Sequence, residues 1–221
     1  MWVEELWRYP VKSMAGERLQ SASLTKQGIV GDRVVQVHDS KGRIATARTY
    51  PALLQFHAVL DASSNVLVDG QPWNSAPVLS AVQAVVGRGS SLVYDESPAR
   101  FDVLPLLVAT DGAIAAFGRD RRRLRPNIII GGVEGLAERT WEGGRLVAGQ
   151  VEIRVEDLRG RCVMTTFDPD TLAHDPTVLR DIVKRFAGTL ALNCAVTTGG
   201  VLRVRQDIEF FPANEAVGRG A

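Results

Sequence analysis

The chain has 221 residues, 45% hydrophobic and 23% charged, which is ordinary for a globular protein. Its 26 Lys and Arg residues nearly balance its 25 Asp and Glu residues, so its charge gives no reason to expect a nucleic-acid or membrane-surface partner. No apolar run is long enough to span a bilayer, the acidic N-terminus is unlike a signal peptide, and the two cysteines fit a reducing compartment. A cytoplasmic protein without a membrane span is therefore expected.

The first hundred residues are predicted to form short strands joined by turns. Alternating and β-branched apolar residues indicate strands at 6–11, 34–37, 44–47, 56–61 and 66–68. The second and third of these are expected to pair as a hairpin. Apolar residues at helical spacing over 78–86 predict one helix, and the Gly- and Ser-rich stretch 87–98 is the predicted domain boundary.

The second half is also predicted to be rich in strands. Apolar runs indicate strands at 127–130, 145–147, 151–155, 190–196 and 201–205, with the last two expected to form a hairpin. Thr110 or Asp111 can cap a short helix that ends near Phe117. An amphipathic helix is predicted over 176–187.

Many short strands and few helices predict a β-rich α+β fold with a barrel-like core. The expected division is an N-terminal barrel-like region at 1–98, a second domain at 99–212 and a flexible tail at 213–221. No strand–helix–strand rhythm is evident in the pattern.

Several common kinds of site are excluded by the sequence. It contains no phosphate-binding glycine motif and no Cys-x-x-Cys, and its three histidines lack metal-ligand spacing. Cys162 is the notable residue, because Arg159 and Arg161 stand close to it and positive charge stabilises a thiolate. Such a thiolate can be a nucleophile or a soft-metal ligand, while the alternative is a small buried apolar side chain. Cys194, inside an apolar strand, is expected to be such a core thiol.

Basic and hydroxyl side chains at predicted strand ends suggest a site for an anion such as phosphate. They are Lys12, Ser13, Arg33 and Arg125, the last followed closely by Asn127. Each of them alone can equally be a solvated charge or a turn residue. Five arginines also fall within 119–125, and this run is either a solvated face or a docking patch for an acidic redox partner.

Taken in order, several segments resemble the MOSC family, in the branch with an N-terminal MOSC beta barrel region that includes the amidoxime-reducing components. In the first region these segments are Leu6–Ser13, Gly28–Arg33 and Thr46–Pro51; in the second they are Leu124–Ile128, Glu138–Trp141 and Arg161–Thr171. The resemblance covers nearly the whole chain. It implies a MOSC-type β-barrel core with an N-terminal β-barrel-like region and a few helices.

The resemblance also implies a molybdenum cofactor bound between the two regions. Cys162 would be the molybdenum ligand and a catalytic residue, and Asp168 would position a proton, although an Asp-Pro turn brace is an equal alternative. The residues that would contact the cofactor are Lys12, Ser13, Arg33, Thr110, Arg125, Asn127, Arg161 and Cys162. The sequence departs from the family pattern at Asn193 and Cys194, where an aromatic residue and Gly are usual, and at Leu172, where Gly is common.

The implied activity is the two-electron reduction of N-hydroxylated or N-oxygenated small molecules. Because the chain has no cysteine cluster for an iron–sulfur centre, the electrons would come from a separate ferredoxin-, flavoprotein- or cytochrome-like protein. The alternative is a carrier that delivers the molybdenum cofactor or sulfur through Cys162 without turnover. An interaction module that binds no cofactor is the third reading.

Overall fold

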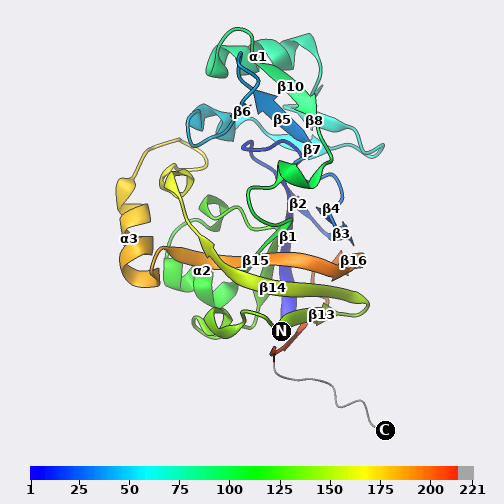
Figure 1. Ribbon diagram of the computed structural model, residues 1–221, viewed down its shortest axis with the longest axis vertical. Coiled ribbons are helices and arrows are strands. Elements are labelled where there is room, and N and C mark those ends of the chain that lie inside the picture. Colours follow the sequence, from blue (N-terminus) through cyan, green and yellow to red (C-terminus); the bar gives the residue numbers. More distant parts are fainter. Residues whose placement is uncertain (214–221) are drawn as a thin grey trace.

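A computed structural model describes residues 1–213, so the tail predicted at 213–221 lies outside the described residues except for its first one. These residues form a β-rich fold with three α-helices, and the predicted β-rich α+β class is confirmed. Figure 1 shows two parts of the chain along the long axis, with the strands of residues 35–94 and helix α1 (Ala76–Val86) above and the large sheet with α2 (Asp111–Phe117) and α3 (Pro176–Phe186) below.

The lower part is built on an eight-stranded sheet with the order β17-β13-β14-β15-β11-β12-β1-β2. No pairing joins its two end strands among the described residues, so the hydrogen-bonded sheet is open rather than a closed barrel. The strands are β1 (Trp2–Arg8), β2 (Glu17–Leu19), β11 (Leu106–Thr110), β12 (Ile128–Gly131), β13 (Arg145–Ala148), β14 (Val151–Gly160), β15 (Thr189–Thr198) and β17 (Glu209–Phe211). Since β1 and β2 belong to this sheet, the N-terminal segment is structurally part of the lower half.

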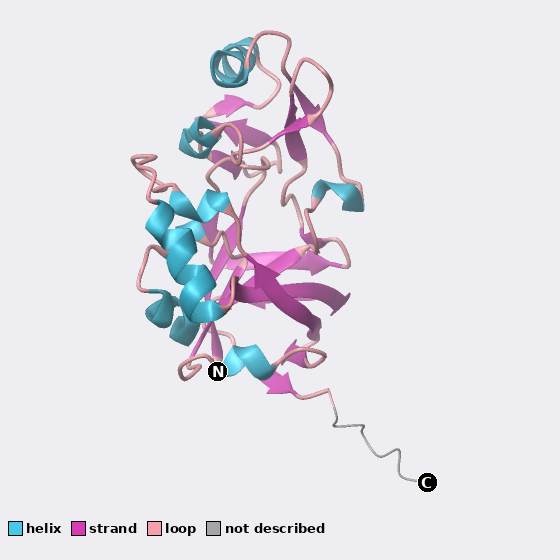
Figure 2. Ribbon diagram, turned by 60° about the vertical axis from the view of Figure 1, so that its left-hand side comes forward, coloured by secondary structure: helices cyan, strands magenta, loops and turns pink. Residues whose placement is uncertain are grey.

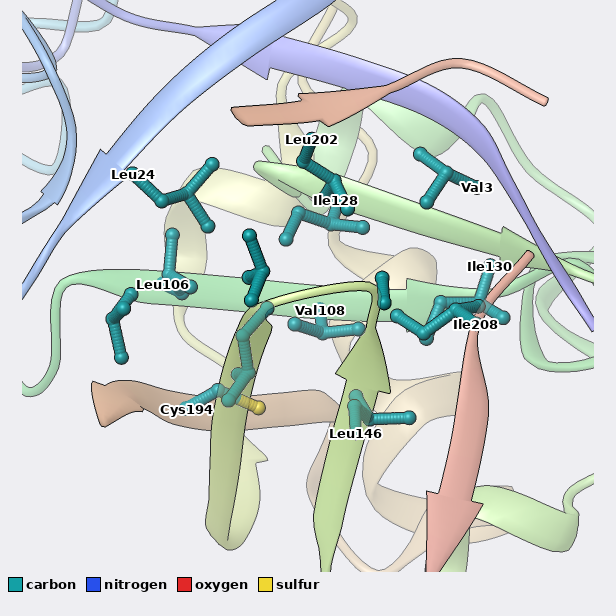
Figure 3. Close-up of a cluster of buried hydrophobic side chains, with 14 of the residues drawn as sticks. Val3, Leu24, Leu106, Val108, Ile128, Ile130, Leu146, Cys194, Leu202 and Ile208 are labelled. Carbon is teal, nitrogen blue, oxygen red and sulfur yellow. The ribbon is translucent and has the colours of Figure 1, made fainter. Parts of the chain in front are cut away.

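The main hydrophobic core is formed by side chains from this sheet and from the strands packed against it. Figure 3 shows strand side chains converging on one cluster, among them Val3, Val108, Ile130 and Leu202. Cys194 on β15 lies in this cluster with no exposed surface, as expected for a core thiol. Burial raises the pKa of its thiol far above the ordinary range, so this cysteine stays protonated.

The upper part contains two small sheets and a core of its own. One sheet contains β5 (Val35–His38), β6 (Ile44–Ala45) and β10 (Ser91–Tyr94), and the other contains β7 (Ala58–Leu60), β8 (Val66–Val68) and β9 (Gln71–Pro72). Helix α1 (Ala76–Val86) buries Val78 and Val82 in the same cluster as these strands. A third small sheet joins β3 (Ser21–Thr25) and β4 (Gly28–Ile29) to the late strand β16 (Gly200–Arg203).

Two helices cover one side of the large sheet, as Figure 2 shows. Helix α2 (Asp111–Phe117) begins at Thr110, whose hydroxyl accepts a hydrogen bond from the amide of Ala113 at 3.1 Å. Helix α3 (Pro176–Phe186) is amphipathic and ends at Ala187 in the left-handed conformation. Its buried Val178, Ile182 and Phe186 pack with α2 side chains in a third core cluster. The predictions of α2 and α3 are confirmed, as is that of α1.

The hairpin predicted from 190–196 and 201–205 is wrong. β15 and β16 follow each other closely, but β16 pairs with β3, while β15 pairs with β14 and β11. The unpredicted unit β11–α2–β12 has parallel strands, because α2 carries the chain across the sheet between them. No helix among residues 1–213 has the length and hydropathy needed to cross a bilayer.

Candidate functional site

A cleft lies where loops from the upper part meet the strand ends of the large sheet. Seven of the residues predicted to contact a cofactor line it, namely Lys12, Ser13, Arg33, Arg125, Asn127, Arg161 and Cys162. They come from three distant parts of the chain, so the fold brings together what the sequence shows only as separate segments. In the first part, Lys12 and Ser13 follow β1 and Arg33 lies before residue 35, where the next strand begins; the second part precedes β12 and the third follows β14.

Three of these residues have a strained backbone. Ser13, Arg33 and Arg125 adopt φ angles of 71°, 56° and 55°, in the left-handed region that disfavours residues with a side chain. Such strain persists only where surrounding contacts over-determine it, and it concentrates at functional sites. Here hydrogen bonds hold the backbone, since the amide of Arg33 donates to the carbonyl of Tyr9 at 2.8 Å and that of Arg125 donates to Arg122 at 3.1 Å.

A buried carboxylate, Asp32, organises the inner wall of the cleft. It has no exposed surface and accepts hydrogen bonds from the amide of Tyr9 at 2.7 Å and from Nδ2 of Asn127 at 3.2 Å. It also forms an ion pair with Arg33. Oδ1 of Asn127 accepts from the amide of Leu107 at 3.2 Å. The side-chain amide of Asn127 is therefore held at its oxygen by a backbone amide and at its nitrogen by a carboxylate, which fixes its orientation in the wall.

Two arginines of the cleft lining stack on one tyrosine. The guanidinium carbons of Arg125 and Arg33 lie 4.2 Å and 5.1 Å from the centroid of the Tyr9 ring, whose hydroxyl donates to the carbonyl of Pro126 at 3.1 Å. Burial lowers the pKa of Arg125 to about 10 and raises the pKa of Tyr9 to about 12. At neutral pH Arg125 is still a cation, but one held in an environment that disfavours its charge.

Cys162 follows the end of β14 and precedes the short 3-10 helix η5 (Val163–Thr166). Its carbonyl accepts from the amide and the hydroxyl of Thr165, at 3.1 and 2.9 Å, and its side chain is partly exposed to the cleft. The preceding Arg161 anchors this turn, because its Nη2 donates to the carbonyl of Leu124 at 2.8 Å. Burial lowers the pKa of Arg161 to about 10. The backbone that carries the thiol is thus held in place directly after a desolvated cation.

A second acid, Asp102, is the internal counterion of the cleft. Lys12 Nζ lies 2.7 Å from its Oδ1, and Arg48 Nη2 lies 2.5 Å from its Oδ2, with Arg159 farther away at 3.9 Å. Burial alone would raise the pKa of Asp102, but Lys12 and the two arginines lower it. For Arg48, burial would lower the pKa, yet Asp102 and Cys162 together raise it. Arg48 therefore lies between the carboxylate and the thiol.

The structure places the other two predicted site residues away from the cleft lining. Thr110 is fully buried, and besides capping α2 its hydroxyl lies 3.2 Å from Oε2 of Glu138. Asp168 accepts hydrogen bonds from the amides of Asp170 and Thr171 at 3.1 and 3.0 Å and pairs with Arg123 at 2.9 Å. These turn hydrogen bonds lower the pKa of Asp168. This arrangement favours the turn-bracing alternative for it.

Four of the five arginines in the run 119–125 have carboxylate partners. Arg119 pairs with Asp181, Arg121 with Glu5, Arg122 with Asp120 and Asp170, and Arg123 with Asp168. Within residues 1–213, Arg125 alone of the five has no carboxylate in a salt bridge. Much of the positive charge that the sequence displays is therefore neutralised locally, which weakens the case for the run as a docking patch.

The donor set of the cleft suits an anionic group with one soft-metal position. Nη2 of Arg125 and Nε of Arg161 are both buried without a hydrogen-bond partner, and groups of this kind need one. No cluster of three or more His, Cys, Asp or Glu occurs in the described residues, so a metal on Cys162 would take its other ligands from the cofactor that carries it. The enclosed volume is about 90 Å³, below the ~300–1,000 Å³ of most ligand clefts. Lining side chains would have to move apart for a whole pterin.

Sequence reasoning missed two acids and one base of this site. Asp32, Asp102 and Arg48 were not singled out, although Asp32 and Arg48 stand inside the segments that carry the family resemblance. The neighbouring pair Asp32 and Arg33 after a glycine was the available signal for the first. Nothing around Asp102 in the sequence marks it, since its role depends on contacts with residues far away in the chain.

Residues 1–100 match the family model described as the MOSC N-terminal beta barrel domain, and residues 113–209 match the one described as the MOSC domain. Mitochondrial amidoxime reducing component 2 of Macaca fascicularis is 28% identical over an alignment that covers 83% of this chain and 72% of that protein. Mitochondrial amidoxime-reducing component 1 of Homo sapiens is 24% identical, with 76% and 67% covered.

Among solved structures, the chain is similar to the YUAD protein from Bacillus subtilis. The TM-score is 0.51 with 14% sequence identity, and the match covers 95% of this chain and 98% of the other. At that identity the likeness concerns the fold alone. It agrees with the β-rich architecture described above.

Proposed function

This chain is a MOSC-domain protein that begins with an N-terminal MOSC region, and we propose that it binds a molybdenum cofactor and reduces N-hydroxylated small molecules with it. The observation that carries the proposal is the cleft, where one thiol lies among seven cationic side chains, two of which have unpartnered nitrogens. MOSC domains are associated with molybdenum cofactor binding. The amidoxime-reducing names of the relatives support the reaction class.

Different residues of the cleft would bind different parts of the cofactor. Cys162 would give a thiolate to the metal, a soft ligand of the kind that molybdenum-type centres accept. The unpartnered nitrogens of Arg125 and Arg161 would donate to anionic oxygens of the cofactor, and Lys12 and Ser13 would hold its phosphate side. Arg33 and Asn127, both fixed by Asp32, would complete the wall.

When bound, the cofactor supplies the two-electron redox chemistry. The overall reaction takes an N-hydroxyl compound, two electrons and two protons to the amine or amide and one water. A separate electron-carrier protein of the ferredoxin, flavoprotein or cytochrome class would supply the electrons. The contribution of this chain is to orient the cofactor and to hold cations around its anionic groups, an electrostatic arrangement that is fixed before the reaction begins.

Metal and pterin analysis of the chain, purified from a molybdenum-replete host, tests the binding half of this proposal. We expect about one molybdenum per chain in the wild type and none in Cys162→Ser, because Cys162 supplies the only thiolate among the described residues that line the cleft. Cys194→Ala is the matched control, since its thiol lies in the sheet core and should leave the metal content unchanged. Wild-type protein without molybdenum would refute cofactor binding.

An assay with a chemically reduced dye tests the catalytic half. Loaded wild-type protein should oxidise the dye only when an N-hydroxyl substrate is added, and amine or amide should accumulate in the same amount. Loaded protein without turnover would refute the reductase and support the alternative carrier of cofactor or sulfur. Neither outcome depends on knowing the natural electron donor.

A further inference from the structure

A second cavity lies against the cleft and is separated from it by a shared wall. Arg123, Arg125 and Met164 line both spaces. The second cavity has a volume of about 230 Å³. That is larger than the ~150 Å³ apolar cavity known to bind benzene, so a benzene ring with a small substituent has room there. We call it the aromatic cavity, after the lining residues Trp7, Tyr9, His57 and Phe167.

The aromatic cavity is made by alternation along β1 and its continuation. Trp7 and Tyr9 are two residues apart, so their side chains share a face of the extended chain. Their rings are stacked, with centroids 6.5 Å apart and an interplanar angle of 13°. Leu54 from the upper part and Met164 and Phe167 from the Cys162 segment close the space. The walls therefore offer mostly carbon surface.

The polar atoms of the two stacked rings are used within the protein. Nε1 of Trp7 donates to Oε2 of Glu5 at 2.8 Å, and the hydroxyl of Tyr9 donates to the carbonyl of Pro126. Along Trp7 and Tyr9, a ligand in the cavity would therefore meet ring surfaces rather than free hydrogen-bonding groups. Such surfaces favour a planar aromatic ligand, which gains from offset or edge-to-face contacts beyond area burial.

Charge at the cavity favours uncharged or anionic ligands over cationic ones. No Asp or Glu is among its lining residues in the described part of the chain, whereas Arg122, Arg123 and Arg125 are. Arg122 and Arg123 are already ion-paired, but Arg125 keeps an unpartnered nitrogen in the shared wall. A cationic ligand would face this uncompensated charge across a short distance.

The shared wall relates the cavity to the reactive position. Met164 is two residues after Cys162 and lines both spaces, and Arg125 does so from the opposite segment. A ring in the aromatic cavity would therefore lie across Met164 and Arg125 from the cleft that contains the thiol, and these two side chains would have to move apart for one molecule to occupy both spaces. We propose that the aromatic cavity binds the planar aryl group of the substrate, uncharged or anionic, and that Trp7 determines this preference. The proposal rests on the proposed function only in taking the ligand to be the substrate, because the binding preference follows from the lining of the cavity itself.

Calorimetric titration of the full chain with paired small probes tests this inference. Benzhydroxamic acid and acetohydroxamic acid carry the same head group and differ in the ring, while benzamide and benzamidine differ chiefly in charge. We expect the aryl hydroxamic acid to bind at least about tenfold more tightly than the methyl compound, because a tenfold difference in affinity corresponds to the free energy of roughly one aromatic contact. Benzamide should bind more tightly than benzamidine.

Variants locate the binding in the cavity. Trp7→Ala and the cavity-filling Ala15→Phe should each remove the aryl preference, while Trp2→Ala, on the same strand but outside the cavity, should keep it. If Trp7→Ala does not fold, as judged by circular dichroism, Ala15→Phe and Trp7→Phe decide, with Trp7→Phe expected to retain the preference.

Equal affinities for the two hydroxamic acids in the wild type, or an aryl preference that survives Ala15→Phe, would overturn the inference. The titrations are made with Cys162→Ser protein as well as wild type, so they need neither molybdenum nor turnover. A protein that binds aryl probes but never holds molybdenum would refute the proposed function and leave the aromatic cavity standing. A working reductase with no aryl preference would refute the inference about the aromatic cavity and leave the proposed function standing.

Discussion

Replacement of Arg125 by Met should stabilise the protein without its cofactor while weakening its hold on anions. The side chain has a pKa lowered by burial to about 10, and each pKa unit corresponds to about 1.4 kcal/mol, so charging it in the folded state costs up to about 3 kcal/mol. The stack on Tyr9 returns about 1–2 kcal/mol. A net destabilisation of about 1–2 kcal/mol remains for the wild-type residue.

The pH dependence of this effect follows from the sign of the linkage. Arg125 is protonated in both the folded and the unfolded chain at neutral pH, so the full destabilisation is present there. It is relieved only as the pH rises above about 10, where the folded chain loses the proton before the unfolded one does. Thermal unfolding at pH 7 is thus the condition for the measurement. The melting temperature of Arg125→Met should rise by about 2–8 °C, at ~2–4 °C per kcal/mol for a chain of this size.

Arg123→Met is the matched control, because it removes the same charge from the same run. Arg123 is paired with Asp168 at 2.9 Å and donates to the carbonyl of Thr165, so its loss should lower the melting temperature instead. Pyrophosphate should raise the melting temperature of the wild type and have a smaller effect on Arg125→Met, since a ligand stabilises only the state that binds it. If both variants are destabilised to the same extent without ligand, the account of Arg125 as an uncompensated cation is refuted.

Three further predictions concern single contacts. Thr110→Ala should destabilise the chain by about 1–2 kcal/mol through loss of the α2 cap, and Thr110→Ser should keep the wild-type stability because serine can make the same cap. An unchanged molybdenum content in Thr110→Ala would show that Thr110 caps the helix and does not contact the cofactor. Gly112→Ala should lower the denaturation midpoint strongly, because a Cβ there would lie 2.2 Å from the carbonyl oxygen of Gly135. Gly160→Ala is the control and should leave the midpoint almost unchanged, because a Cβ at Gly160 would have no atom within 4 Å. Equal shifts of the midpoint in the two variants would contradict this packing. In a spectrophotometric titration of the three tyrosines, a step near pH 12 should disappear in Tyr9→Phe, and since the unfolded chain loses that proton earlier, the wild type should lose stability as the pH rises from about 10 to about 12.

The strands and helices that the sequence predicted correctly are those with a strong local pattern. The apolar spacing of 78–86 and 176–187 and the cap at Thr110 are local signals, and all three helices formed within a residue or two of their predicted ends. Strand pairing is not local. The chain from β15 into β16 has the composition of a hairpin, but the exposed edge of β3 takes β16 instead. No spacing within 190–205 encodes that choice.

The same distinction explains which site residues were found. Lys12, Ser13, Arg33 and Arg125 stand at strand ends, where sequence reasoning looks for binding groups, and all four line the cleft. Whether they hold a cofactor stays a prediction. Leu172 departs from the family pattern, yet its φ of 59° lies in the region that favours glycine, so the loop keeps a glycine-like turn at some conformational expense. That outcome could not be foreseen from residue type.

Arg125 shows why composition alone cannot assign a basic residue to a site. Five arginines in the run 119–125 are chemically identical in the sequence, and the 3-10 turn Arg121–Arg123 directs its side chains toward acids. Arg125 itself has a left-handed backbone, and its side chain lies over Tyr9 instead, with one nitrogen unpartnered. The run thus contains four cations paired with acids and one, with a strained backbone, that has no carboxylate partner among the described residues. Because strain and desolvation both oppose this arrangement, its retention is best explained by a ligand that repays them.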